Sequence, residues 1–80
     1  MMKVMQMKRI RVGDRYKLDG VSQYGHTRED DIVRIESGDI VTKAKDTLSD
    51  KLHLRSMYCI NGKYVDISES IIDRYFVKVD

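Results

Sequence analysis

The segment around Asn61-Gly62 restricts the fold more than any other part of the sequence, because it has the form of a β-hairpin. Two runs rich in aromatic and β-branched residues, 57–60 and 63–67, flank this dipeptide. Asn-Gly tolerates the positive φ angles that a two-residue type I′ turn requires. Pairing outward from the turn predicts three opposed pairs: Ile60 with Lys63, Tyr58 with Val65, and Ser56 with Ile67.

The alternation of this hairpin assigns its two faces. The buried face should carry four apolar side chains: Tyr58, Ile60, Val65 and Ile67. The opposite face should be half exposed and carry Met57, Cys59, Tyr64 and Asp66.

A period close to two continues through most of the chain and predicts further short strands. Residues 9–12 and 15–18 are expected to form two strands, or one strand bent at Gly13. Residues 32–36 and 39–45 are expected to pair as a tight hairpin about Ser37-Gly38, with a polar turn after them at 46–50. Residues 19–31 predict a long surface loop or an irregular hairpin, of a length that is often functional. A last strand is expected over 75–79.

Residues 68–74 are the one helical candidate. Ser68 can cap the first turn, and Glu69 favours a helix N-terminus. About two turns of helix cannot persist in water without tertiary packing, which Ile71 and Ile72 would supply. The element order predicts a mainly β fold, a small SH3-like barrel of five or six short strands with one short helical turn. Residues 1–80 should form this single domain, with 1–8 as an N-terminal extension.

Composition excludes several classes of protein. Cys59 is the single cysteine, so no intramolecular disulfide and no cysteine-rich metal site can form. The two histidines and the acidic run at 29–31 do not have the spacing of zinc or calcium ligands. The chain has neither a long apolar span nor the pattern of a signal peptide. We therefore expect a cytoplasmic protein without metal, cofactor or membrane partner.

Three segments resemble small phage and prophage accessory proteins. They are Val-Gly-Asp-Arg-Tyr-Lys at 12–17, Asp-Ile-Val-Arg-Ile-Glu-Ser-Gly-Asp-Ile-Val at 31–41, and Asp-Ile-Ser-Glu-Ser-Ile-Ile-Asp-Arg-Tyr-Phe-Val-Lys-Val at 66–79. Those proteins share a Gly-Asp/Gln-aromatic-Lys opening, a central hairpin and a Ser-started turn before a closing Phe-x-x-Val strand. The resemblance spans residues 12–79, and the chain departs from it in longer segments at 19–31 and 46–56. It implies an SH3-like barrel that acts by binding in a host cytoplasm and brings no catalytic residues.

The aromatic residues favour a protein-binding function. The chain has five tyrosines, one phenylalanine and no tryptophan, and a barrel of this size cannot bury all five tyrosines. Tyrosine suits interfaces because it combines an apolar ring with a polar tip. We predict a protein-binding surface that includes Tyr24, His26 and Tyr64. The partner would be a host or phage protein that the chain modulates, and self-association is an alternative.

The basic N-terminal segment supports a second hypothesis. Residues 1–18 carry six basic side chains and one acidic one, whereas 19–50 carry four basic and eight acidic ones. A basic groove with a stacking aromatic is how small barrels hold single-stranded nucleic acid. The candidate residues are Lys8, Arg9, Arg11, Arg15, Tyr16 and Lys17. The simpler interpretation of the same segment is a solvated, charged edge strand.

A third hypothesis is ribonuclease chemistry in the 19–31 segment. His26, Arg28 and Glu29 could act as acid, charge stabiliser and base, as in some SH3-like toxins. Adjacency in a loop does not make side chains converge, and His53 has no positional relation to Cys59 that indicates a catalytic pair. We therefore predict a protein that is not an enzyme.

Overall fold

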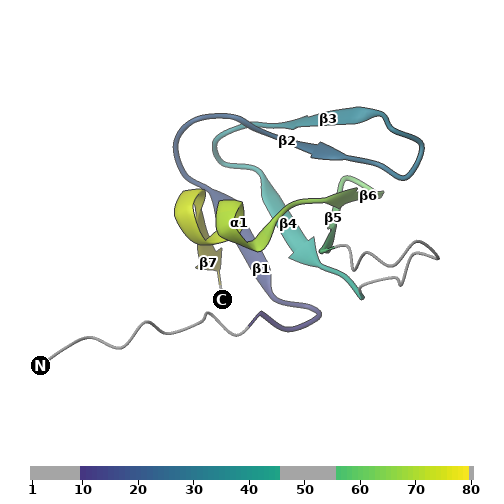
Figure 1. Cartoon of the computed structure of the whole chain (residues 1–80). Helices are drawn as coiled ribbons and strands as arrows, with labels where there is room; N and C mark the ends of the chain where they lie inside the picture. The colour runs from purple at the N-terminus through teal and green to yellow at the C-terminus, as the bar shows by residue number, and fades with distance from the viewer. Residues whose placement is uncertain (1–9, 46–55, 80) are drawn as a thin grey trace, which may run out of the picture.

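The computed structural model describes residues 10–45 and 56–79. These residues form a single antiparallel sheet and one short helix (Figure 1). The elements are β1 (Arg15–Leu18), β2 (Gln23–His26), β3 (Ile32–Ile35), β4 (Ile40–Lys43), β5 (Met57–Ile60), β6 (Lys63–Asp66), α1 (Glu69–Tyr75) and β7 (Phe76–Val79).

The predicted mainly β fold with a short helix before the last strand is confirmed. The strand order is β3-β2-β6-β5-β4-β1-β7, so β3 and β7 form the two edges. The described residues form seven strands, rather than five or six, and their sheet is open rather than closed. The predicted extension at 1–8 and the predicted turn at 46–50 lie outside the described residues.

The hairpin of β5 and β6 has the predicted register. Tyr58 lies opposite Val65, and Ile60 lies opposite Lys63. Asn61 and Gly62 both have positive φ, at 50° and 79°. All four residues predicted for its inner face are buried. The outer face differs at one position, because Met57 is only 4% exposed.

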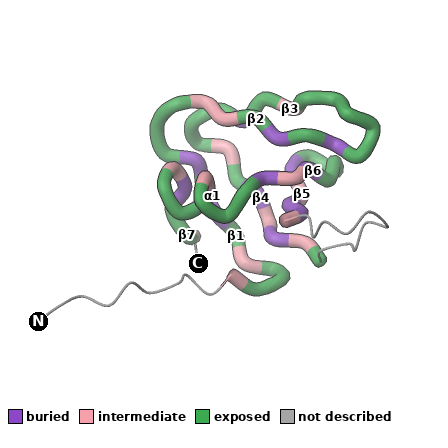
Figure 2. Tube along the Cα trace, in the orientation of Figure 1, coloured by how far each residue is buried: buried purple, intermediate pink, exposed green. Residues whose placement is uncertain are grey.

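The core lies on the inner face of the sheet, where every strand except β2 contributes a buried apolar side chain (Figure 2). The helix closes one end of this core through Ile72. Its start is as predicted, since the Ser68 hydroxyl accepts a hydrogen bond from the Ile71 N–H at 3.3 Å. The buried core residues are Tyr16, Leu18, Ile35, Val41, Tyr58, Ile60, Val65, Ile67, Ile72 and Phe76.

The predicted hairpin about Ser37-Gly38 is wrong. The turn exists, with the Asp39 N–H bonded to the Glu36 carbonyl at 2.9 Å, but β3 pairs with β2 and β4 pairs with β1 and β5. The Gly38 N–H donates instead to the carbonyl of Leu18, and the Leu18 N–H donates to the carbonyl of Asp39. These bonds connect the turn to the end of β1. The chain therefore changes direction at this turn, and β3 and β4 do not pair with each other.

The predicted strand over 9–12 is also absent from the described part of that segment. Residues 12 and 13 form a turn, in which the Asp14 N–H donates to the Arg11 carbonyl at 3.0 Å. The Asp14 carboxylate accepts from the Arg11 N–H at the same distance. Gly13 has a φ of 97°, which permits this reversal before β1.

The sequence predicts either a long surface loop or an irregular hairpin over residues 19–31. These residues contain the strand β2 and the tight turn that leads to β3, so the hairpin prediction is closer to the structure. β2 is short and polar; it pairs with β3 along its whole length, and Gly25 allows its backbone to lie close to β6. A Cβ atom at Gly25 would lie 2.9 Å from the Cβ and 3.0 Å from the Cγ2 of Val65. Because Gly25 has no side chain, the hairpin of β2 and β3 can pack closely against the core at Val65.

Replacing Gly25 with alanine should lower the free energy of unfolding by about 1–3 kcal/mol, because the new methyl group overpacks a fully buried site. Urea unfolding of the variant measures this loss. Tyr24→Ala is the control, since Tyr24 is exposed on the same strand and should cost less. Equal losses in the two variants would show that β2 does not pack against Val65 as closely as described.

Candidate functional site

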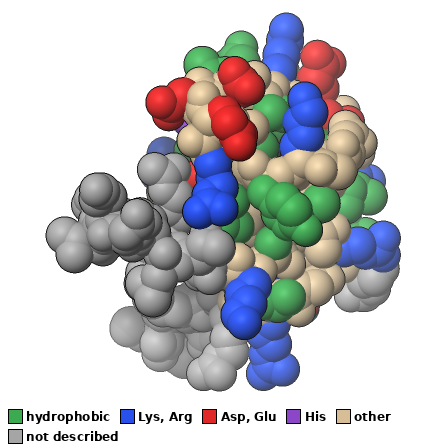
Figure 3. All heavy atoms as spheres, turned by 90° about the vertical axis from the view of Figure 1, so that its right-hand side faces the viewer, with side chains coloured by type: hydrophobic (Ala, Val, Ile, Leu, Met, Phe, Trp, Pro, Cys, Tyr) green, Lys and Arg blue, Asp and Glu red, His purple; other side chains and the backbone are tan. Residues whose placement is uncertain are grey.

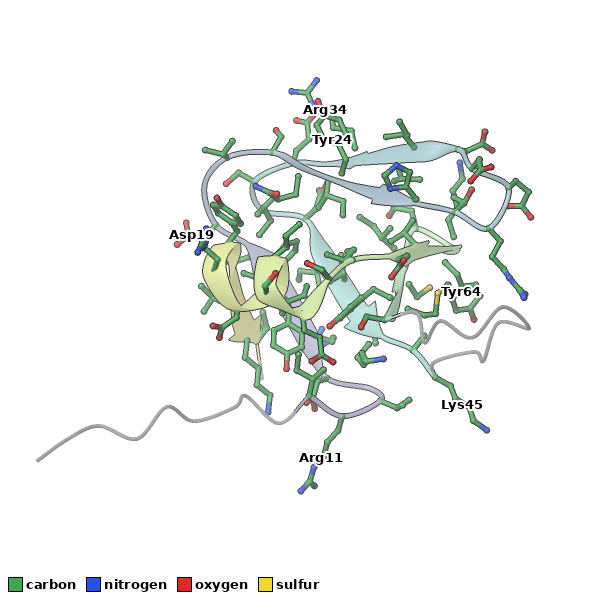
Figure 4. All side chains as sticks on the ribbon, in the orientation of Figure 1. Arg11, Asp19, Tyr24, Arg34, Lys45 and Tyr64 are labelled. Atoms are coloured by element: carbon green, nitrogen blue, oxygen red, sulfur yellow. The ribbon has the colours of Figure 1, made fainter. Side chains whose placement is uncertain are left out.

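Tyr64 is the most accessible aromatic side chain on the outer face of the β5–β6 hairpin. Its side chain is 57% exposed, as predicted from the register of the hairpin. Two pockets adjoin at this residue, and both are lined by Tyr64 and Arg28. Figure 4 shows Tyr64 and Lys45 on the same side of the molecule.

The two pockets differ in chemistry. The first, the loop groove, has a volume of about 520 Å³, and the second, the Met57 pocket, has about 320 Å³. We call the two together the Tyr64 surface. The loop groove is lined by Thr27, Arg28, Glu29, Asp31, Ile32, Val33, Lys63 and Tyr64. The Met57 pocket is lined by Arg28, Ala44, Lys45, Met57 and Tyr64.

Arg28 lies in the turn between β2 and β3, which is closed by hydrogen bonds among Thr27, Asp30 and Asp31. The Thr27 N–H donates to the Asp31 carbonyl at 2.8 Å, and the Asp30 N–H donates to the Thr27 carbonyl at 3.0 Å. The Thr27 hydroxyl accepts a further bond from the Asp31 N–H. Asp30 adopts a φ of 68°, as expected of the last residue in a three-residue hairpin loop. The turn is thus internally bonded, and it presents Arg28 to both pockets.

A buried lysine, Lys43, is bonded to the backbone of two residues that line the Met57 pocket. Lys43 is 5% exposed, and its ammonium donates to the Ala44 carbonyl at 2.7 Å. The ammonium nitrogen lies 5.4 Å from the centre of the Tyr58 ring, within cation–π range. The Ala44 N–H donates to the Met57 carbonyl at 2.9 Å. These contacts connect Ala44, at the end of β4, with Met57, at the start of β5, and both residues line the pocket.

The side chains around Tyr64 are mainly cationic. Arg28, Lys45 and Lys63 are exposed and line the pockets. None of the three makes an ion pair with another of the described residues. Figure 3 shows hydrophobic side chains at the centre of this face, with Lys and Arg around them and acidic side chains gathered at one end. The apolar lining of the Met57 pocket was missed from the sequence because it depends on contacts between three separate segments.

Tyr24 and His26 do not join this surface. Both project from the outer face of the β2–β3 hairpin, where Tyr24 lies opposite Arg34 and His26 lies opposite Ile32. Tyr24 is 54% exposed, as expected. Figure 4 shows Tyr24 and Arg34 together, well away from Tyr64. The residues predicted for one protein-binding surface therefore belong to two.

The basic N-terminal segment is only partly suited to nucleic acid. Arg11, Arg15 and Lys17 are exposed, whereas Tyr16 is 1% exposed in the core. The interpretation of Tyr16 as a stacking residue is therefore corrected, because its ring faces inward with Leu18. Lys8 and Arg9 lie outside the described residues.

Burial raises the pKa of the Tyr16 hydroxyl above its usual value of 10.0, with smaller contributions from the charge and hydrogen bond of Asp14 and the charge of Glu69. The neutral phenol is thus favoured by folding. Its contribution to stability is complete below pH 10 and is lost as the pH rises through the folded-state pKa. Urea unfolding at a series of pH values above 10 measures how the free energy of unfolding falls with pH. We expect this fall to be smaller for the Tyr16→Phe variant than for the parent protein. Parallel losses in the two proteins would contradict this role.

The candidate ribonuclease residues are not brought to one cavity. Arg28 and Glu29 line the loop groove, but His26 is not among its lining residues. Within residues 10–45 and 56–79, no group of three or more His, Cys, Asp and Glu side chains could hold a metal ion. In the same ranges no helix is long and apolar enough to cross a membrane. Cys59 is half-buried on β5, and His53 lies outside the described residues.

No family model, curated protein or solved structure matches the chain. The function is therefore argued from the residues of the site.

Proposed function

We propose that this chain is a non-catalytic binding module that binds a protein through the Tyr64 surface. The observation that carries the proposal is a largely exposed tyrosine at the junction of two pockets, beside exposed cations. Tyrosine and arginine are enriched among residues that dominate binding energy at protein interfaces. The internally bonded turn that carries Arg28 reduces the entropy lost on binding.

We also propose that the fold is a variant of the SH3-like barrel. Support comes from the order β7-β1-β4-β5-β6, with α1 between β6 and β7 and the β2–β3 hairpin inserted between β1 and β4. A phage origin and a host or phage protein as the partner, bound in the host cytoplasm, complete this proposal. They rest on the sequence resemblance alone.

Affinity capture from a bacterial lysate, with and without nuclease, tests the proposal. A protein that is retained in stoichiometric amount after nuclease treatment is the expected result. Recovery of nucleic acid alone, or of proteins that all disappear after nuclease treatment, would contradict it.

A second candidate function is binding of single-stranded nucleic acid on the outer face of the sheet. One observation favours it: direct cross-strand pairs connect Tyr64 to Cys59, Cys59 to Thr42, and Thr42 to Arg15. Tyr64, rather than Tyr16, would then be the stacking aromatic. This candidate requires an affinity that falls steeply with salt and that is lost when Arg11, Arg15 and Lys17 are replaced. Affinity that is insensitive to salt would exclude it.

A further inference from the structure

The Met57 pocket combines apolar and cationic lining residues. Met57, Ala44 and the Tyr64 ring supply apolar surface, and the charged side chains among its lining residues are Arg28 and Lys45. Among residues 10–45 and 56–79, no carboxylate lines this pocket. Its volume of about 320 Å³ is at the lower end of the range for ligand pockets, roughly 300–1,000 Å³, which suits one large side chain.

The loop groove, which shares Arg28 and Tyr64 with this pocket, differs from it because carboxylates are also among its lining residues. Glu29 and Asp31 line it, together with Lys63. Among the described residues, the Tyr64 surface is therefore asymmetric in charge: its carboxylates line only the loop groove, whereas the charged side chains that line the Met57 pocket are the cations Arg28 and Lys45. A bound chain would be oriented by this asymmetry.

We propose that the Tyr64 surface recognises an extended acidic peptide segment of a partner protein. One large apolar side chain of the segment enters the Met57 pocket, and neighbouring carboxylates pair with Arg28 and Lys45. This inference rests on the proposed protein-binding function and specifies the chemistry of the partner. The apolar side chain supplies most of the affinity, because exposed ion pairs contribute little. The two cations supply selectivity, since arginine can bind a carboxylate through two parallel hydrogen bonds.

A peptide fits this surface better than a nucleic acid does. A phosphate backbone carries negative charge along its whole length, and it gains affinity by replacing many counterions with protein cations. Glu29 and Asp31 would repel such a backbone where it passed through the loop groove. A peptide can place its carboxylates at one end only and leave the acidic end of the groove to neutral or basic residues.

Selection from a library of short random peptides displayed against the full-length protein tests the inference. We expect the selected sequences to combine a large apolar residue with nearby Asp or Glu. A fluorescein-labelled selected peptide should bind the double variant Arg28→Glu/Lys45→Glu at least about tenfold more weakly by fluorescence anisotropy. The matched control is Arg15→Glu/Lys17→Glu, which reverses two exposed cations of β1 and should leave affinity within about twofold.

Three outcomes would overturn the inference: selected peptides without an excess of acidic residues, equal affinity for both double variants, or no selected peptide at all. In a competition experiment, oligo-thymidylate should displace the labelled peptide less effectively than the same weight of unlabelled peptide does. Equally effective displacement would also overturn the inference, in favour of nucleic acid. Failure of the protein-binding proposal is distinguishable. If selected peptides are not acidic but still require Tyr64, the charge inference fails and the binding surface stands. If neither peptides nor captured proteins require Tyr64, both fail.

Discussion

Replacing Ile72 with alanine is expected to lower the free energy of unfolding by about 2–5 kcal/mol, the range for truncating a buried aliphatic side chain. Ile72 is fully buried and is the one buried residue of α1. A seven-residue helix has little stability of its own, so its packing through Ile72 decides whether it forms. A domain of this size has a stability near the lower end of about 5–15 kcal/mol. The loss therefore approaches the whole stability of the fold.

Ile71→Ala is the matched control, because it removes the same atoms from the neighbouring, half-buried position of α1. Urea unfolding followed by circular dichroism should give a loss for Ile71→Ala less than half of that for Ile72→Ala. A larger loss at Ile71 would mean that α1 packs against the sheet through a different face.

Replacing Tyr64 with alanine is expected to weaken binding of the captured partner by at least about 30-fold, or about 2 kcal/mol. The ring contributes to the lining of both pockets, so its removal takes away contact area from each of them. The substitution should not unfold the domain, because more than half of the side chain is exposed. Isothermal titration calorimetry with the captured protein measures the change.

Tyr24→Ala provides the control for this measurement. It removes an aromatic ring of similar exposure from the outer face of the β2–β3 hairpin, away from Tyr64. Affinity within about twofold of the parent protein is expected, as for a residue outside the interface. If Tyr24→Ala weakens binding more than Tyr64→Ala, the interface lies on the β2–β3 hairpin.

Local sequence patterns predicted the parts of the fold that local interactions determine. The Asn61-Gly62 turn fixes the β5–β6 register, and therefore the outward position of Tyr64. Ser68 fixes the start of α1 by capping it. Neither feature needs a contact with a distant segment to be recognised.

Long-range contacts explain where sequence reasoning failed. The turn at Ser37-Gly38 looks like that of a hairpin, but the carbonyl of Leu18 accepts its Gly38 N–H and redirects the chain. The polar β2 segment pairs with β3, and the absence of a side chain at Gly25 lets it lie close to Val65. The burial of Met57 and its proximity to Arg28 likewise follow from pairings between segments far apart in the sequence. The period-two pattern predicts which side chains of a strand share a face of the sheet. It does not predict how one hairpin packs against another.

Mapping of backbone amide chemical shifts is the most direct test of the central claim that the Tyr64 surface binds a protein. The isotopically labelled full chain would be titrated with the captured partner. The largest shifts are expected at Arg28, Met57 and Tyr64, with small changes at Arg15 and Tyr24. Shifts that concentrate on Arg15 and Lys17, or on Tyr24 and Arg34, while the Tyr64 surface stays unperturbed, would contradict it.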